Sequence, residues 1–125
     1  MFKPCLLAFV EDKNFQSQLE AVTQANGVEV YFASEGEQLA QLVKTITAFM
    51  VLVDLSNSDA EWLFKHISAI VEMNPKLPVF GFSESQIPTA VRDRAERYGC
   101  RLIFLKPELL EELPNLLTKA LSGGF

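Results

Sequence analysis

Short apolar runs alternate with longer amphipathic stretches five times along the 125-residue chain. The apolar runs have the length and the content of buried strands, and they cover residues 5–10, 28–32, 49–53, 78–82 and 102–105. Repeated strand–helix alternation predicts an α/β domain with a mainly parallel, doubly wound sheet that has helices on both faces. The nearly unbroken apolar character of the first and third runs agrees, because parallel strands buried on both sides lack polar alternation.

The segments between the strands carry apolar residues at helical spacing. Gly27, Asn74-Pro75 and Gly99 are expected to end the first, third and fourth helices. The last helix is expected over roughly 109–121 with a late or irregular start, because Pro114 is tolerated only near a first turn. The apolar stripes are Phe15, Leu19 and Val22; Leu39, Leu42, Val43 and Ile46; Trp62, Leu63, Ile67, Ile70 and Val71; and Ala90, Val91, Ala95 and Tyr98.

Length and charge limit the classes of function. The length suits one domain over residues 1–125, with 121–125 as a tail or the start of a linker. A net charge of −5 disfavours direct nucleic-acid binding, which depends on clustered lysine and arginine. Cys5 and Cys100 lack the spacing of metal ligands or of a disulfide framework, and both are expected to be small buried residues. With neither a membrane span nor a signal peptide recognisable, the chain is expected to be cytoplasmic.

Polar residues follow four of the predicted strands. Glu11 and Asp12 come after the first strand, and Asp54 ends the third. Ser83 follows the fourth strand and Lys106 the fifth. Because the carboxyl ends of parallel strands meet at one edge of a sheet, three carboxylates, a hydroxyl and an ammonium group are expected to converge there. For the strand order 2-1-3-4-5, the reactive position at that edge lies between strands one and three.

A cluster of carboxylates favours a bound cation. Two carboxylates about 4 Å apart repel by roughly 4 kcal/mol at an effective dielectric constant near 20. Mg²⁺ suits such a site, because it prefers oxygen ligands and binds through one or two carboxylates together with phosphate oxygens. Asp54 is then the candidate nucleophile toward a phosphoryl group. Lys106 and Ser83 are candidates for neutralising and hydrogen-bonding the transferred oxygens.

Each of these residues also has a purely structural interpretation. Glu11 and Asp12 are suited to cap the first helix, and Asp54 to end a strand. Ser83 and Lys106, taken singly, are ordinary loop and surface residues. The functional interpretation rests on their occurrence together at one edge of one fold.

In their order and spacing, these residues resemble the receiver domain of two-component response regulators. The resemblance extends from Leu6 to Leu121, and it implies a flavodoxin-like (βα)5 fold in which Asp54 accepts a phosphoryl group. It also implies that Ser83 contacts this group and that Lys106 pairs with it. The implied Mg²⁺ ligands are Glu11, Asp12, Asp54 and the backbone carbonyl of Ser56. The motifs that carry the resemblance are Val10-Glu11-Asp12, Val51-Leu52-Val53-Asp54, Ser83, Gly99 and Lys106-Pro107.

The chain departs from the family pattern around the site. Asn57-Ser58 stand where receivers usually have a methionine–proline pair. Glu84 follows the hydroxyl residue, where a small residue is usual, and it adds repulsion if it points inward. Ile103 takes the position of the usual aromatic switch residue. Trp62, at the start of the third helix, is interpreted as a packing residue or as a cover over the acceptor.

Two functions follow from the resemblance. A receiver takes a phosphoryl group from a sensor histidine kinase or a phosphotransfer protein, and it is no enzyme beyond its own phosphotransfer and dephosphorylation. Its fourth helix, fifth strand and fifth helix then bind a downstream protein or a second copy, with no membrane or nucleic-acid partner. The alternative is a pseudo-receiver, which uses the same fold for phosphorylation-independent interaction or dimerisation. Glu84, Ile103 and the altered loop motivate this alternative.

Two enzyme classes share this fold class and fit the residues less well. A flavin carrier needs a phosphate loop rich in serine, threonine and glycine after the first strand, where this chain has Glu11-Asp12-Lys13-Asn14. A phosphatase with two aspartates needs a second acid two residues after the nucleophile, where this chain has Ser56.

Overall fold

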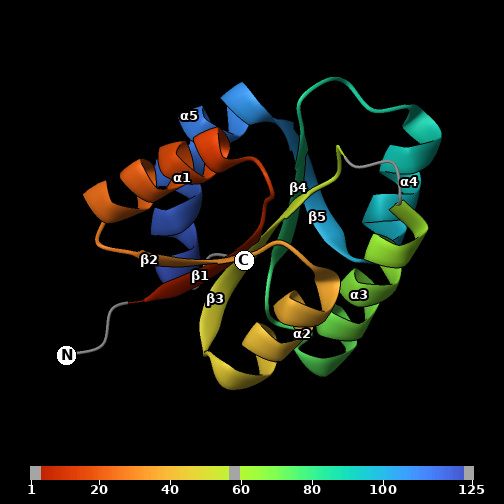
Figure 1. Ribbon diagram of the computed structural model, residues 1–125, viewed down its shortest axis with the longest axis horizontal. Coiled ribbons are helices and arrows are strands. Elements are labelled where there is room, and N and C mark those ends of the chain that lie inside the picture. The colour runs from red at the N-terminus through yellow and green to blue at the C-terminus, as the bar shows by residue number, and fades with distance from the viewer. Residues whose placement is uncertain (1–3, 57–59, 123–125) are drawn as a thin grey trace.

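The structure is a computed structural model that describes residues 4–56 and 60–122. Five parallel strands form one sheet in the order β2-β1-β3-β4-β5, as Figure 1 shows. This order confirms the predicted doubly wound, flavodoxin-like fold. The elements are β1 (Cys5–Phe9), α1 (Lys13–Ala25), β2 (Glu29–Ala33), α2 (Gly36–Thr45), β3 (Ala48–Asp54), α3 (Ala60–Met73), β4 (Val79–Ser83), α4 (Thr89–Tyr98), β5 (Cys100–Leu105) and α5 (Lys106–Leu121).

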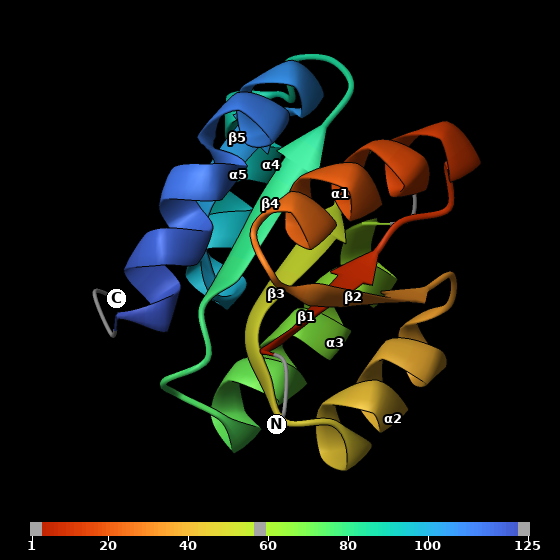
Figure 2. The same ribbon diagram turned by 90° about the vertical axis from the view of Figure 1, so that its left-hand side faces the viewer.

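The core has two layers, one on each face of the sheet. Helices α1 and α5 cover one face, and α2, α3 and α4 cover the other (Figures 1 and 2). Strand β1 supplies both layers, since Leu6 and Ala8 belong to the first and Leu7 and Phe9 to the second. All four of these side chains are buried, which explains the unbroken apolar run in the sequence.

The prediction for the last helix is wrong. Helix α5 begins at Lys106, directly after β5, and it contains Pro114 in its interior. Pro107 lies in the first turn, where a missing N–H costs nothing, and the Glu108 side chain accepts the Leu105 N–H at 3.0 Å. Four leucines then hold the helix on the sheet, and this burial outweighs the cost of the interior proline. They are Leu109, Leu113, Leu116 and Leu117.

The other predicted elements exist and differ only at their ends. Strand β5 begins at Cys100, two residues before the predicted run, because Gly99 turns the chain directly from α4 into the strand. Cys100 is buried as expected, whereas Cys5 at the start of β1 is only half-buried. Across the described ranges, no helix combines the length and the apolar character needed to cross a membrane.

Candidate functional site

A cavity of about 250 Å³ lies at the carboxyl edge of the sheet. Phe9 ends β1 and Asp54 ends β3, and the other lining residues come from the segments that follow β1, β3, β4 and β5. Four of the residues predicted at this edge therefore line one cavity: Glu11, Asp12, Asp54 and Lys106. The remaining lining residues are Ser56 and Glu84.

Lys106 lies at the centre of the charged groups. Its Nζ atom is 3.4 Å from Asp12 Oδ2, 3.4 Å from Glu84 Oε1 and 3.9 Å from Asp54 Oδ2. The ammonium group also lies 5.0 Å from the centre of the Phe15 ring, within the range of a cation–π contact. The lysine side chain is 12% exposed, so these interactions are less screened than those of a surface lysine. One cation thus partly neutralises three acids.

The two carboxylate oxygens of Asp12 have different partners: one caps helix α1 and the other contacts Lys106. Its Oδ1 atom caps α1 by accepting hydrogen bonds from the Asn14 and Phe15 N–H groups, at 3.0 and 3.5 Å. Its Oδ2 atom faces Lys106. Partial desolvation raises the pKa of Asp12, but the two backbone hydrogen bonds and Lys106 outweigh it and hold this pKa below its usual value. The carboxylate is therefore kept ionised beside the cavity.

Asp54 is the last residue of β3, and its side chain is 14% exposed. Its Oδ1 atom accepts the Ser56 N–H at 2.8 Å, while Oδ2 is the atom nearer to Lys106. The next residue, Leu55, continues the sheet by donating its N–H to the Phe82 carbonyl at 2.7 Å. Asp54 is thus held in place by the backbone hydrogen bonds of the two residues that follow it, with one carboxylate oxygen on the side of the ammonium group.

Ser83 does not join these groups. It is 2% exposed, and its hydroxyl donates a hydrogen bond to the Ser85 carbonyl within its own loop. Within the described residues, the hydroxyl that lines the cavity is that of Ser56, for which the sequence predicted only a backbone role. A contact between Ser83 and a phosphoryl group requires its hydroxyl to leave Ser85.

Glu84 was expected to add repulsion at the acceptor if it points inward, and it does reach the cavity, where it contacts Lys106. Its carboxylate pairs with Lys106, and its backbone N–H donates to Ser56 Oγ at 3.0 Å. The side chain is 70% exposed, so it reaches the lysine from the mouth of the cavity. Neither this contact nor the Phe15 ring beneath the lysine was predicted from the sequence. The available signal was the position of Glu84 directly after a strand end, at the same edge of the sheet as Lys106.

The donor set has the chemistry that Mg²⁺ prefers. Asp12 and Asp54 supply carboxylate oxygens, and Mg²⁺ commonly binds to one or two carboxylates while keeping several waters. In the part of the chain that the structure describes, no group of three or more histidine, cysteine or acidic residues is arranged to hold a metal ion. The residues thus fit a hydrated ion on two carboxylates better than a cage of protein ligands.

Two features predicted near the site lie outside the described residues. They are the altered loop at Asn57-Ser58 and the side chain of Trp62, together with its interpretation as packing residue or cover.

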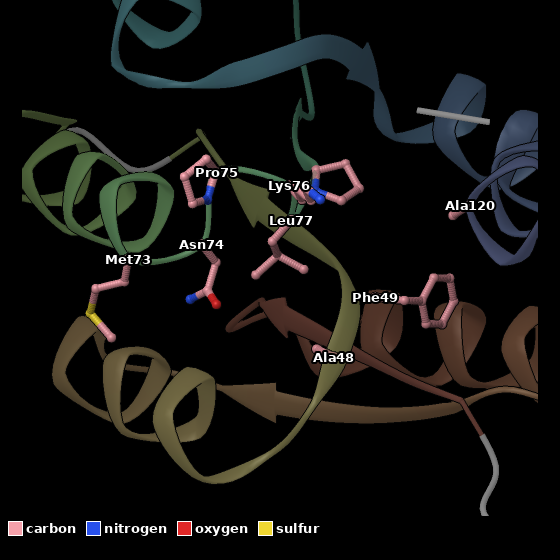
Figure 3. A pocket seen from close by; sticks show the side chains of 9 residues that line it. Ala48, Phe49, Met73, Asn74, Pro75, Lys76, Leu77 and Ala120 are labelled. Carbon is pink, nitrogen blue, oxygen red and sulfur yellow. The ribbon is translucent and has the colours of Figure 1, made fainter. Parts of the chain in front are cut away.

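A larger cavity, of about 720 Å³, lies at the opposite edge of the sheet. Figure 3 shows Met73 and Asn74 at the end of α3, Leu77 in the following loop and Phe49 on β3, on the side toward Ala120 of α5. Ala48 begins β3 and Pro78 precedes β4, so this groove opens at the amino ends of the strands. It is mostly apolar and shares no residue with the acidic cavity.

Comparisons with known proteins define the fold. No family model and no curated protein sequence matches the chain. A response regulator from Thermotoga maritima superposes with a TM-score of 0.82 at 19% identity, over 97% of this chain and 99% of that one. The chemotaxis protein CheY4 from Vibrio cholerae gives 0.78 at 16% identity, over 95% and 99% of the two chains. The chain has the receiver-domain fold.

A third receiver-fold structure is a CheY-like protein, tadZ, from Pseudomonas aeruginosa. It gives a TM-score of 0.78 at 18% identity, over 94% of this chain and 98% of that one. All three structures are matched over nearly their whole length, so the likeness includes every element of the sheet and both helical layers. The receiver fold suggested by the motifs at the strand ends is therefore confirmed by the whole architecture.

Proposed function

We propose that the chain is a phospho-accepting receiver module in which Asp54 takes the phosphoryl group. The observation that carries the proposal is the position of Asp54 at the end of a central strand, with Lys106 3.9 Å from its Oδ2 atom and a second acid, Asp12, on the same lysine. A partly buried carboxylate beside a cation has the arrangement that phosphoryl transfer requires, since that chemistry depends mainly on positioning and charge.

The proposed step uses groups of this chain together with a donor phosphohistidine. Asp54 Oδ2 forms a bond to phosphorus as the phosphorus–nitrogen bond of the donor breaks. The electron pair stays on the imidazole nitrogen, which takes up a proton, and an aspartyl phosphate results. Lys106 neutralises the transferred oxygens. Asp12 and Asp54 would hold Mg²⁺, with Glu11 and the Ser56 carbonyl as further candidate ligands, and the bound ion would supply charge neutralisation.

The proposed partners follow from this chemistry and from the exposed surface. The phosphoryl donor is a sensor histidine kinase or a phosphotransfer protein, which fits a cytoplasmic location. The downstream partner, or a second copy in a homodimer, binds the surface of α4, β5 and α5. Leu102 on the edge strand β5 is 48% exposed there, α4 carries Arg97 in its last turn, and α5 carries the acids Glu111 and Glu112. Such an apolar contact with charged neighbours allows charge to select the partner.

The test is metal-dependent phosphorylation by a small acyl phosphate or phosphoramidate. Intact-mass measurement is expected to show the addition of one phosphoryl group to the wild-type chain, dependent on Mg²⁺. Asp54→Asn is expected to abolish it. Asp93→Asn, which removes an exposed acid on α4, is expected to leave it unchanged. Absence of an adduct on the wild type, or an adduct that persists in Asp54→Asn, contradicts the proposal.

The second candidate is a pseudo-receiver, an interaction module that works without phosphorylation. The contact that favours it is the ion pair between Glu84 and Lys106, because the lysine already has acidic partners in the absence of a phosphoryl group. One similar structure carries the description of a putative pilus assembly-related protein from Burkholderia pseudomallei, with a TM-score of 0.77 at 17% identity. For this candidate, self-association or partner binding is expected to be the same in wild type and Asp54→Asn.

A further inference from the structure

The groups that would bind an anion on Asp54 are already engaged by this chain. Two donors belong to residues that line the cavity from beyond β4 and β5: the Glu84 N–H and the Lys106 ammonium group. The Ser56 hydroxyl accepts the first at 3.0 Å, and the Glu84 carboxylate pairs with the second at 3.4 Å. An incoming phosphoryl group needs such donors, because three oxygens and their charge require partners.

Ser56 links these contacts to the acceptor itself. Its backbone N–H donates to Asp54 Oδ1 at 2.8 Å, while its hydroxyl holds the Glu84 backbone. The segment after β3 is thus tied to the segment after β4, and the Glu84 side chain is directed to Lys106. Glu84 is an anion, so it not only occupies the lysine but also repels a second anion placed on Asp54.

We propose that Ser56 and Glu84 form an internal latch that competes with an anion on Asp54 and so sets how readily this site is occupied. The proposal rests on the proposed function, because it concerns the same acceptor. In it, occupation of Asp54 breaks the Glu84–Lys106 pair and frees the Glu84 N–H from Ser56. Glu84 and Ser56 attenuate the site and determine its affinity, and neither takes part in a bond-forming step.

The experiment is a titration of the full chain with the phosphoryl mimic beryllofluoride in the presence of Mg²⁺, followed by fluorine NMR of the bound mimic. Glu84→Gln keeps the shape of the side chain and removes its charge. We expect it to lower the concentration for half-saturation about two- to five-fold, the range that an exposed ion pair supports. Ser56→Ala is expected to act in the same direction, and the double variant to exceed either alone.

A matched control is Glu37→Gln, which removes one exposed acidic charge in the first turn of α2, from a residue that does not line the cavity. It is expected to leave half-saturation unchanged. A second measurement tests the latch without any mimic. An amine-reactive reagent is expected to modify Lys106 faster in Glu84→Gln than in the wild type, and peptide mass spectrometry measures the rate. Because the Glu84 side chain is 70% exposed, the variant is expected to retain the fold, and circular dichroism checks this.

The outcomes separate the latch from the proposed function. Tighter binding in Glu84→Gln, or binding only in the variants, supports the latch. Equal or weaker binding in Glu84→Gln and Ser56→Ala, with clear binding by the wild type, overturns the latch and leaves the acceptor role intact. Failure of the wild type and of every variant to bind the mimic overturns the acceptor role, and the latch with it.

Discussion

Lys106 illustrates how a single residue organises the acidic edge. Three carboxylates lie within 4 Å of its Nζ atom, so the cation offsets part of their mutual repulsion. Its Phe15 contact adds a further attraction from below. Because Asp12 and Glu84 are nearer than Asp54, the lysine is shared rather than dedicated to the acceptor.

Cys100 has a measurable effect on the pH dependence of stability. Burial, with a smaller contribution from Glu96, raises the pKa of its thiol from 9.0 to about 12. The unfolded chain therefore loses this proton before the folded chain does, and stability falls as the pH rises between these two values. Between pH 8 and about pH 10.5, the free energy of unfolding is expected to fall by about 1–2 kcal/mol less in Cys100→Ala than in the wild type. Urea denaturation at the two pH values measures this difference.

The matched control is Cys5→Ala. The Cys5 thiol is only half-buried, and its pKa is raised by desolvation and by Glu29. This substitution is expected to change the pH slope less. If the free energy of unfolding depends on pH in the same way in the wild type and in Cys100→Ala, the thiol titrates alike in the folded and unfolded chains. That result contradicts the effect assigned to its burial.

The sequence was sufficient to predict which residues lie at the carboxyl edge but not how their side chains are directed. Asp12, Asp54 and Lys106 were placed together because parallel strands all end at the same edge. The directions of Ser83 and Glu84 depend on short loop hydrogen bonds, to the Ser85 carbonyl and to Ser56. Periodicity carries no information about such rotamers, so their contacts were not predicted.

At the scale of the elements, the two glycines that follow helices are not equivalent. Gly99 has φ +131°, and a Cβ atom on it would lie 2.5 Å from Val71 Cγ2 on α3. Gly27 has φ +73°, and a Cβ atom there would meet nothing within 4 Å. Gly99→Ala is therefore expected to lower the free energy of unfolding by at least about 2 kcal/mol, from backbone strain and overpacking. Gly27→Ala is expected to cost about 1 kcal/mol, from strain alone.

The Val71 contact separates the two contributions at Gly99. Val71→Ala is expected to relieve the overpacking but not the backbone strain, so Gly99→Ala should cost less in the Val71→Ala background. If urea denaturation shows that Gly99→Ala and Gly27→Ala lower the free energy of unfolding equally, the role assigned to the contact with Val71 on α3 is wrong.

Helix α5 contains two prolines with opposite expected effects. Pro114 lacks the N–H that would bond to the Leu110 carbonyl, whereas Pro107 lies in the first turn, where no such bond is made. Pro114→Ala is expected to raise the free energy of unfolding by about 1–2 kcal/mol, after the greater freedom of the unfolded chain is subtracted. Pro107→Ala is expected to change it by less than about 1 kcal/mol, in the destabilising direction. A destabilising Pro114→Ala contradicts the argument.

These elements also show which parts of the fold could be predicted. Strand–helix alternation predicted every element, because the strands are apolar runs, the inner ones buried by helices on both sides, and each helix has an apolar stripe. The start of α5 could not be predicted from Pro114, since the burial of the four leucines is a tertiary effect that overrides local propensity.

At the scale of the whole molecule, the acidic cavity joins segments that follow four of the five strands. Unfolding separates these segments, so a ligand that needs them together binds only the folded chain. Such a ligand raises the free energy of unfolding by about 2.7 kcal/mol when its concentration is 100 times its dissociation constant. For a domain of this size, that corresponds to roughly 10 °C in the midpoint of thermal unfolding. Site occupancy and global stability are therefore coupled.

This coupling distinguishes a receiver from a pseudo-receiver. With Mg²⁺ and beryllofluoride at saturation, the wild-type midpoint is expected to rise by several degrees in differential scanning fluorimetry, and chelation of Mg²⁺ is expected to reverse the rise. Asp54→Asn is expected to show no rise, because the mimic then lacks its carboxylate partner, while Asp93→Asn keeps it. An equal rise in Asp54→Asn places the ligand elsewhere. If the midpoint rises in none of the three proteins, even at the highest concentration of Mg²⁺ and beryllofluoride tested, the result favours the interaction module. Lys106 then keeps its internal acidic partners.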